Sequence, residues 1–266
     1  MNIEVVKLAC FSPTGTTKAI AKAIAKGIGE TTVEMVDITR PEVREKPFST
    51  SADELLVMAV PVYAGRVPVV LSAWLDAFKA DNTPVVCVVV YGNRDYDDAL
   101  LELKDIMKQK GAVPLAGAAF IGEHSFSSED TPVAVGRPDE ADLSLAEEFG
   151  RKLADKLKSF ESIDEIPELT VSGKYPYKEF SPPISADFMI VSDECTQCGL
   201  CAEACPTGAI NPEESSDVVQ EKCIRCCACI KICPEGARVM KPSPLKDIAV
   251  KLFNNCKERK EPVLFF

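Results

Sequence analysis

Apolar runs of strand length alternate with amphipathic stretches through the first 160 residues of the chain. The apolar runs lie at 3–11, 33–38, 54–60, 84–91 and 113–122. Between them apolar residues recur at helical spacing, as Ile20, Ile24 and Ile28 do within residues 16–29. Further helical patterns cover residues 68–80, 96–110 and 139–160. Five apolar strands that alternate with helices predict an α/β fold with a doubly wound five-stranded parallel sheet, covered by helices on both faces.

The pattern changes near residue 161. Residues 162–186 are rich in proline, serine and tyrosine and have no hydrophobic period, which predicts a linker. Its aromatic residues Tyr175, Tyr177 and Phe180 favour a linker that lies against a surface over one that is free in solvent. Residues 1–161 are therefore expected to form a separate α/β domain.

Two further segments follow the linker. Residues 187–241 hold nine of the twelve cysteines and predict a small second domain. Residues 242–266 form a tail with a helical stretch near 244–256 and the apolar end PVLFF. We expect this tail to dock the two domains against each other.

Acidic residues outnumber basic ones, 41 against 30, and the formal net charge is −11. Such a surface repels nucleic-acid phosphates and anionic lipids, so neither is an expected partner. The charge suits docking against basic patches on partner proteins, and solubility alone explains it equally well.

The apolar runs are too short to cross a membrane. The longest, VVCVVV at 85–90, falls well below the roughly 18 residues of a spanning helix. The N-terminal MNIEVVKLAC lacks the basic start and the cleavage site of a signal peptide. We therefore expect a cytoplasmic protein, in a compartment where thiols stay reduced.

The spacing of the cysteines separates the common explanations of a cysteine-rich segment. Disulfides are disfavoured in the cytosol, and structural zinc typically uses Cys-x2-Cys pairs separated by a longer loop. This chain instead has two copies of Cys-x2-Cys-x2-Cys-x3-Cys-Pro. The first copy contains Cys195, Cys198, Cys201 and Cys205, and the second contains Cys223, Cys226, Cys229 and Cys233.

This double pattern resembles that of bacterial two-cluster ferredoxins, which are small α+β domains. In such proteins three thiolates of one copy and the fourth of the other copy hold each cluster. The resemblance implies one [4Fe-4S] cluster on Cys195, Cys198, Cys201 and Cys233. It implies a second [4Fe-4S] cluster on Cys223, Cys226, Cys229 and Cys205. The repeated CPTGAI at 205–210 and CPEGAR at 233–238 supports two equivalent halves.

The remaining cysteines lie outside this pattern. Cys227 is expected to fill space beside a cluster rather than to ligate it. Cys10 and Cys87 fall inside apolar strands and are expected in the core. Cys256 is either structural or a free reactive thiol.

The stretch FSPTGTT, directly after the first strand, has the composition of a phosphate-binding loop. Gly15 permits a tight turn, and the following helix directs its first N–H groups at the same point. Hydroxyl donors come from Ser12, Thr14, Thr16 and Thr17. Neither a P-loop nor a Gly-x-Gly-x2-Gly motif is present. Such a stretch can also be no more than a helix N-cap.

Ser-x-Thr-Gly-x-Thr between the first strand and first helix resembles the FMN-phosphate loop of flavodoxins, which bind FMN outside the carboxyl ends of the strands. Two later loops would then embrace the flavin ring. The implied ring residues after the third strand are Pro61, Tyr63, Ala64, Gly65 and Arg66. Those after the fourth strand are Tyr91, Gly92, Asn93, Arg94, Tyr96 and Asp97. The alternative is a flavodoxin-like domain without a cofactor.

Three charged or titratable residues allow two interpretations each. Arg66 and Arg94 either stabilise reduced flavin or pair with Asp95, Asp97 or Asp98. His124, the only histidine, is either a polar loop residue or a hydrogen-bond donor that titrates near neutral pH.

The segment order, with GEHSFSS and GRPDEADL near 122–143, resembles the flavodoxin–ferredoxin fusion proteins of anaerobic bacteria and archaea. The resemblance implies a redox relay in which FMN and two [4Fe-4S] clusters interconvert two-electron and one-electron traffic. The alternative is a flavin-dependent reductase of a small oxidant, with the ferredoxin half as its electron supply. We expect the ferredoxin domain to pack over the carboxyl edge of the sheet, towards 61–68 and 91–99, within one chain or in a homodimer.

Overall fold

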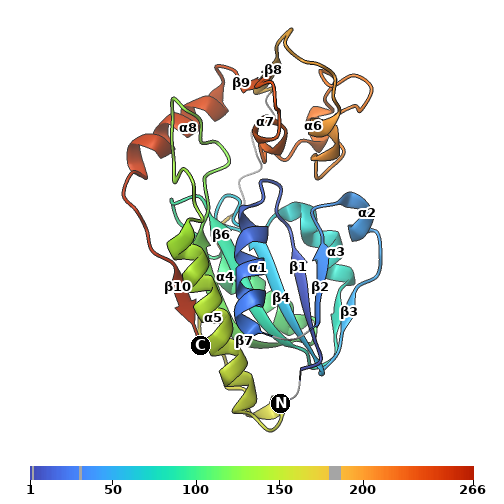
Figure 1. Ribbon diagram of the computed structural model, residues 1–266, viewed down its shortest axis with the longest axis vertical. Helices are drawn as coiled ribbons and strands as arrows, with labels where there is room; N and C mark the ends of the chain where they lie inside the picture. The colour runs from blue at the N-terminus through green and yellow to red at the C-terminus, as the bar shows by residue number, and fades with distance from the viewer. Residues whose placement is uncertain (2, 30–31, 180–186) are drawn as a thin grey trace.

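Six strands form the central sheet of the N-terminal domain, in the order β10-β7-β6-β4-β1-β2 (Figure 1). They are β1 (Val5–Cys10), β2 (Thr32–Asp37), β4 (Glu54–Pro61), β6 (Pro84–Tyr91), β7 (Val113–Ile121) and β10 (Val263–Phe265). The computed structural model describes residues 1, 3–29, 32–179 and 187–266. All strands except β10 are parallel, and their order 2-1-3-4-5 along the chain is that of the flavodoxin-like doubly wound fold.

Helices cover both faces of this sheet, as the continuous apolar strands predict. Helices α1 (Thr16–Ile28) and α5 (Glu140–Lys158) pack on one face, and α3 (Ser72–Ala77) and α4 (Ala99–Gln109) pack on the other. Neighbouring strand residues point to opposite faces, so Cys10 is buried under the first pair of helices and Cys87 under the second. Both cysteines therefore lie in the core, as their position in apolar strands indicates.

Two glycines let α1 and α5 approach closely. A Cβ atom on Gly27 would lie 1.9 Å from the carbonyl oxygen of Glu147, and one on Gly150 would lie 2.1 Å from that of Ile24. No side chain fits in either place, so the contact between the two helices requires glycine on both.

Two helices differ from their predicted bounds. The pattern at 68–80 becomes a 3₁₀ turn at Val69–Leu71 and the short α3, because Phe78 turns into extended backbone and Lys79–Ala80 pairs as strand β5 with β3 (Ser49–Thr50). Helix α4 begins at Ala99 rather than near residue 96, because Asp97 has a positive φ of 43° that interrupts helical geometry.

The second domain forms the upper lobe in Figure 1. Its strands β8 (Met189–Val191) and β9 (Arg238–Met240) pair antiparallel, and its short helices are α6 (Leu200–Glu203) and α7 (Ala228–Lys231). Each helix follows two cysteines of one copy of the repeated pattern, so the two halves have the same local structure.

The described part of the linker lies along α4, as its aromatic residues indicate. Tyr177 donates a hydrogen bond to Asp105 at 2.7 Å, and the backbone N–H groups of Lys174 and Lys178 donate to Asp98. Phe180 lies outside the described residues.

The tail runs from the upper lobe back to the sheet. Ser243 caps α8 (Pro244–Asn255), and the chain then descends beside α5 to β10 (Figure 1). Strand β10 pairs antiparallel with β7, with Leu264 opposite Ala118. The sequence predicts an apolar docking segment here but not a sixth strand, because three residues are too few for a recognisable period.

Candidate functional site

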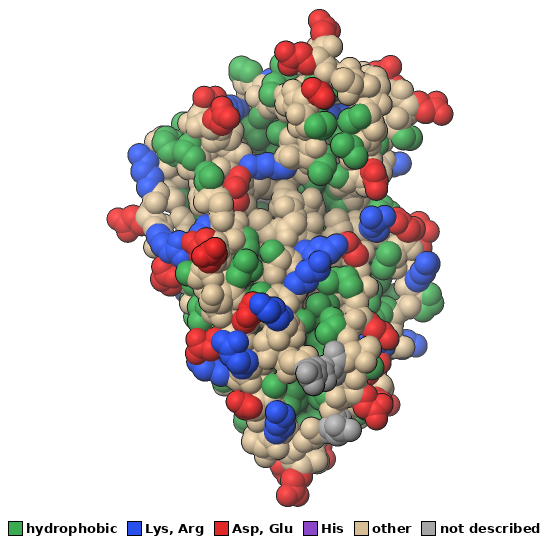
Figure 2. All heavy atoms as spheres, viewed as in Figure 1, with side chains coloured by type: hydrophobic (Ala, Val, Ile, Leu, Met, Phe, Trp, Pro, Cys, Tyr) green, Lys and Arg blue, Asp and Glu red, His purple; other side chains and the backbone are tan. Residues whose placement is uncertain are grey.

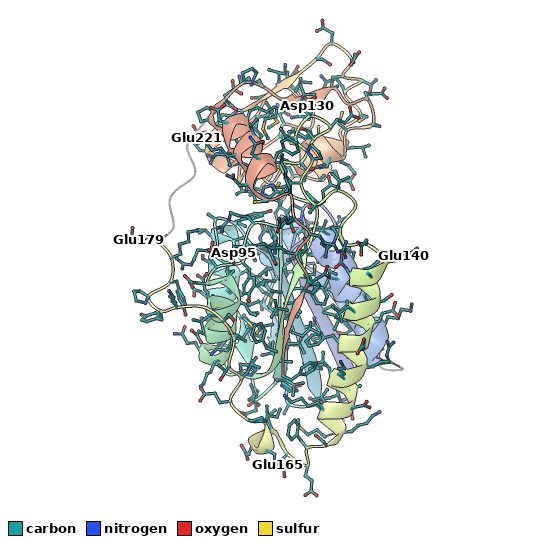
Figure 3. All side chains as sticks on the ribbon, turned by 90° about the vertical axis from the view of Figure 1, so that its left-hand side faces the viewer. Asp95, Asp130, Glu140, Glu165, Glu179 and Glu221 are labelled. Atoms are coloured by element: carbon teal, nitrogen blue, oxygen red, sulfur yellow. The ribbon has the colours of Figure 1, made fainter. Side chains whose placement is uncertain are left out.

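The upper lobe lies over the carboxyl ends of the parallel strands (Figures 1 and 3). Arg44, which ends α2 (Pro41–Arg44), donates to the carbonyl oxygen of Pro206 at 2.5 Å. Lys231 of α7 donates to the carbonyl oxygen of Ser127 at 2.9 Å and forms an ion pair with Glu123. The two domains are therefore joined at the edge where flavodoxin-like folds bind ligands.

A long connection between β7 and α5 extends the contact. Figure 3 shows the segment that carries Asp130 reaching the upper lobe. Phe126 of this segment packs against the core of the cysteine-rich domain, beside the ring of His124 at 5.0 Å between centroids. The lower domain thus contributes an apolar side chain to the upper one.

Tyr63 connects the loop after β4 with the cysteines. Burial raises the pKa of its hydroxyl well above the usual value, and the neighbouring Cys226 and Cys227 raise it further. Ile224, two residues before Cys226, packs against the same core of the lower domain as Tyr63. One group of cysteines therefore faces the loop at 61–68.

The cysteines surround two cavities, which we call cluster sites. The first cluster site is lined by Cys195, Cys198, Cys201 and Cys233 together with Ser215 and Arg238. The second is lined by Cys205, Cys223, Cys226 and Cys229 together with Cys227 and Met189. The fold thus brings together the two sets of four that the ferredoxin resemblance implies.

The donor sets fit clusters better than single ions. Tetrahedral zinc, with Zn–S bonds of about 2.3 Å, needs its sulfurs within roughly 4 Å of one another. Among the described residues no three Cys, His, Asp or Glu side chains are grouped closely enough to hold one metal ion. A four-iron cube spreads its thiolates more widely, which suits the two cavities.

Burial also affects the thiols of the second cluster site. It raises the pKa of Cys226 to about 12 and that of Cys229 to about 11. Without a metal these thiols stay protonated at neutral pH, so ligation must release their protons. The Ala209 N–H donates to Cys205 Sγ at 3.2 Å, which is the kind of amide contact that stabilises a ligating sulfur.

The position of Cys227 in the second copy of the cysteine pattern corresponds to a glycine, Gly199, in the first copy. It precedes α7 with a φ of 57°, and Gly199 precedes α6 with a φ of 77°. Its thiol is buried against the second cluster site and donates to the Arg225 carbonyl oxygen at 3.7 Å. This placement agrees with a space-filling residue, and a left-handed conformation is one that cysteine adopts only at a cost.

The loop after β1 has the features of an anion site. Gly15 caps α1 with a φ of 87°, and within the described residues the N–H groups of Thr16 and Thr17 reach no protein acceptor. Ser12 Oγ accepts the Lys18 N–H at 3.0 Å, which leaves its own proton free to donate. Thr14 and Thr16 are partly exposed. These groups fit an FMN phosphate at the start of α1.

The two presumed ring loops meet at the same edge but use many of their side chains internally. Gly65 lies against Asp97, where a Cβ atom would come within 2.2 Å of the carboxylate. Tyr91 and Tyr96 pack on each other with centroids 5.5 Å apart. Asn93 is buried and donates to two carbonyl oxygens of the tail.

Tyr63, Ala64, Gly65 and Arg66 form a tight turn after β4. The backbone of Tyr63 and Arg66 exchanges two hydrogen bonds of 3.0 Å across Ala64 and Gly65, which both have positive φ. Pro61 ends β4, and Gly92 lies under the ring of His124. Tyr63 is thus the ring-loop aromatic that faces the second domain.

Both arginines have protein partners. Arg66 makes a bidentate pair with Glu102, at 2.7 and 2.8 Å, rather than with Asp95, Asp97 or Asp98. The sequence missed Glu102 because it lies one turn inside α4. Arg94 pairs with Asp97, which agrees with the interpretation that it forms an ion pair with a neighbouring aspartate.

His124 does not titrate near neutral pH. Burial, with the positive charges of Lys231 and Arg94, lowers its pKa from 6.5 to about 4. Its Nδ1 accepts the Phe126 N–H at 3.0 Å, which places the proton of the neutral ring on Nε2. The coupling of proton and electron uptake through His124, one of its two interpretations, is therefore not supported.

The single histidine allows a direct test. Because its folded pKa lies below the usual value, its carbon and nitrogen NMR signals should stay those of the neutral ring from pH 8 to about pH 5 and change with a midpoint near pH 4. In the urea-unfolded chain the midpoint should return to about 6.5. A midpoint near 6.5 in the folded protein would contradict the buried position.

Three contacts between distant residues escaped the sequence analysis. Arg44 bonds to Pro206, Asn93 bonds to Cys256 in the tail, and Arg238 bonds to Ser215. Only Arg238 left a signal, since it replaces Ile210 of the repeated CPTGAI motif.

Comparison with known proteins agrees with the cysteine pattern. Residues 188–211 and 220–236 each match a 4Fe-4S binding domain, and together they contain all eight pattern cysteines. A stretch of 29 residues, 11% of this chain, is 55% identical to a ferredoxin of Megasphaera elsdenii and spans 54% of that protein. The upper lobe is therefore a 4Fe-4S ferredoxin region.

The lower domain is similar to solved flavodoxins. An archaeal flavodoxin is 15% identical with a TM-score of 0.40, over 58% of this chain and 99% of its own. The two-electron reduced flavodoxin of Megasphaera elsdenii is 18% identical with a TM-score of 0.39, over 56% and 98%. The strand order described above, rather than these distant similarities, defines the fold.

The chain thus joins a flavodoxin-like α/β fold to a C-terminal region that matches 4Fe-4S binding domains. Among the residues that the structure describes, none of the helices combines the length and the apolar character that crossing a membrane requires.

Proposed function

We propose that this protein relays electrons between FMN and two [4Fe-4S] clusters and exchanges them with redox partner proteins in the cytoplasm. When bound, FMN can take up one or two electrons, whereas each cluster carries one. The observation that carries the proposal is the proximity of Tyr63, in the loop after β4, to the second cluster site: Ile224, two residues before Cys226, packs on the same core as Tyr63. An internal electron path requires such proximity.

The residues of the chain divide this task. Ser12, Thr14, Thr16 and Thr17 bind the FMN phosphate, and the loops at 61–68 and 91–99 border the ring. The first cluster site takes Cys195, Cys198, Cys201 and Cys233, and the second takes Cys223, Cys226, Cys229 and Cys205. Gly15 permits the tight turn of the phosphate loop. Tyr63 excludes water from the space between the loop at 61–68 and Cys226.

The first cluster site is the end of the path that faces partners. Cys198 is exposed, and so are the surrounding Asp193, Glu194 and Glu235. Figure 2 shows acidic side chains projecting from this upper lobe. A partner with a basic patch would meet complementary charge there. The segments 1–161, 162–186, 187–241 and 242–266 then serve as flavin domain, linker, cluster domain and docking tail.

A reductase of a small oxidant is the second candidate. It is favoured by the position of His124, whose Nε2–H remains a hydrogen-bond donor beside Gly92. Its neutral ring cannot supply a proton at neutral pH as an imidazolium would. The relay is therefore the function that the geometry supports best.

Rapid mixing tests the internal path. After reduction by dithionite, electrons should pass from the clusters to FMN at a rate that is independent of protein concentration, because the two domains are docked within one chain. Stopped-flow absorbance over a tenfold range of concentration measures this rate. A rate that rises linearly with concentration would mean transfer between molecules.

The docking contact provides a matched pair of variants. Lys231→Ala removes the bonds to Glu123 and Ser127, and it should slow the transfer. Lys222→Ala removes an exposed lysine of the same domain and should leave the rate unchanged.

A further inference from the structure

The upper lobe contains a buried positive charge without a carboxylate partner. Arg238, at the start of β9, is 2% exposed. Its guanidinium donates to Met189 Sδ at 3.5 Å and to the carbonyl oxygen of Ser215, and in the described part of the chain it forms no ion pair. Burying an unpaired guanidinium is unfavourable, so this position implies a negative charge that the polypeptide itself does not supply.

Arg238 lies between the two cluster sites. It lines the first cluster site directly. Towards the second site, Met189 stands between Arg238 and Cys229, whose Sγ lies 3.8 Å from Met189 Sδ.

Ser215, which also lines the first cluster site, has a side-chain hydroxyl without a hydrogen-bond partner. It is 1% exposed, and its Oγ is the one buried side-chain oxygen or nitrogen among the described residues that has no hydrogen-bond partner. Its backbone N–H is satisfied by Gln197 Oε1 at 2.9 Å. Because Ser215 lines the first cluster site, its hydroxyl proton can be given to a sulfur there.

The repeated motif places the charge in only one half of the domain. CPTGAI at 205–210 and CPEGAR at 233–238 are equivalent, so Arg238 corresponds to Ile210. Ile210 is buried among apolar side chains. The two otherwise equivalent halves therefore differ by a buried cation.

We propose that Arg238 and Ser215 raise the reduction potential of the cluster in the first site above that of the cluster in the second. Reduction adds one electron, and so one negative charge, to a cluster, and a buried cation and a hydroxyl donor stabilise that charge. The cluster of the first site is then reduced before the cluster of the second site, which lies beside Tyr63. This inference rests on the two clusters of the proposed function.

Potentiometric titration monitored by EPR tests the order of the two clusters. Cys198→Ser alters the first site and so identifies its signal. In the wild-type protein that signal should appear at the higher potential. If the cluster of the second site is reduced first, the proposal is overturned. A wild-type chain that holds clearly fewer than about eight irons after reconstitution would contradict the proposed function instead.

Matched variants test the two residues. Arg238→Met should lower the reduction equilibrium constant of the first cluster at least tenfold, which is about 59 mV for one electron. Arg238→Lys keeps the positive charge, so it should lower this constant much less. Ser215→Ala should lower it about threefold or more. Lys241→Met removes an equal charge, paired with Asp187 near the surface, and should change it less than about twofold. Equal effects of the Arg238 and Lys241 substitutions would overturn the proposal. If the Arg238→Met variant does not take up clusters, the proposal is tested by the order of the two reduction potentials in the wild-type protein and by the shift in the Ser215→Ala variant.

Discussion

Replacing Thr14 and Thr16 together by alanine should weaken FMN binding by roughly 100-fold or more. Each hydroxyl is expected to donate to a dianionic phosphate, and a hydrogen bond to a charged group is typically worth about 1.5–3 kcal/mol. The N–H groups at the start of α1 remain, so binding should be weakened rather than abolished. Fluorescence titration of the flavin-free protein with FMN measures the change.

Riboflavin supplies the internal control for this prediction. Riboflavin lacks the phosphate, so it should bind to the wild-type protein far more weakly than FMN does. Its affinity for the double variant should equal its affinity for the wild-type protein. Thr170→Ala, which removes an exposed hydroxyl from the linker, should leave both affinities unchanged. An unchanged FMN affinity in the double variant would place the phosphate elsewhere.

Cys226→Ala should reduce the iron content from about eight to about four per chain, because one of two four-iron clusters loses a ligand. Cys227→Gly should keep about eight irons. Its φ of 57° is left-handed, like the φ of 77° at Gly199 in the other half, so glycine relieves a conformation that costs cysteine about 1 kcal/mol. Iron and acid-labile sulfide are measured after anaerobic reconstitution.

The adjacent positions make this pair of variants a sharp test of the ligand assignment. Both cysteines are buried and both line the second cluster site, so burial alone does not distinguish them. If the two variants lose iron equally, Cys227 is not the spare residue. Cys227→Ala serves as a further control that keeps the Cβ atom.

Local pattern determined much of this protein. The alternation of apolar strands with amphipathic helices predicts the five parallel strands, because the period of side-chain burial depends on neighbouring residues only. The Cys-x2-Cys-x2-Cys-x3-Cys-Pro copies likewise predict three neighbouring cysteines in each turn, since their spacing is local, whereas the exchange of the fourth cysteine between the copies is implied by the resemblance to two-cluster ferredoxins. The phosphate loop is recognisable for the same reason, as Ser12 to Thr17 are contiguous.

Tertiary structure alone decided the contacts between distant segments. Strand β10 is too short to be recognised in isolation and exists because the edge of β7 is free to pair with it. The pairing of Arg66 with Glu102 arises from packing within the lower domain. The loss of a neutral-range titration at His124 and the position of Tyr63 near Cys226 arise from packing between the two domains. Sequence spacing carries no information on such pairs, because desolvation and charge act through space rather than along the chain.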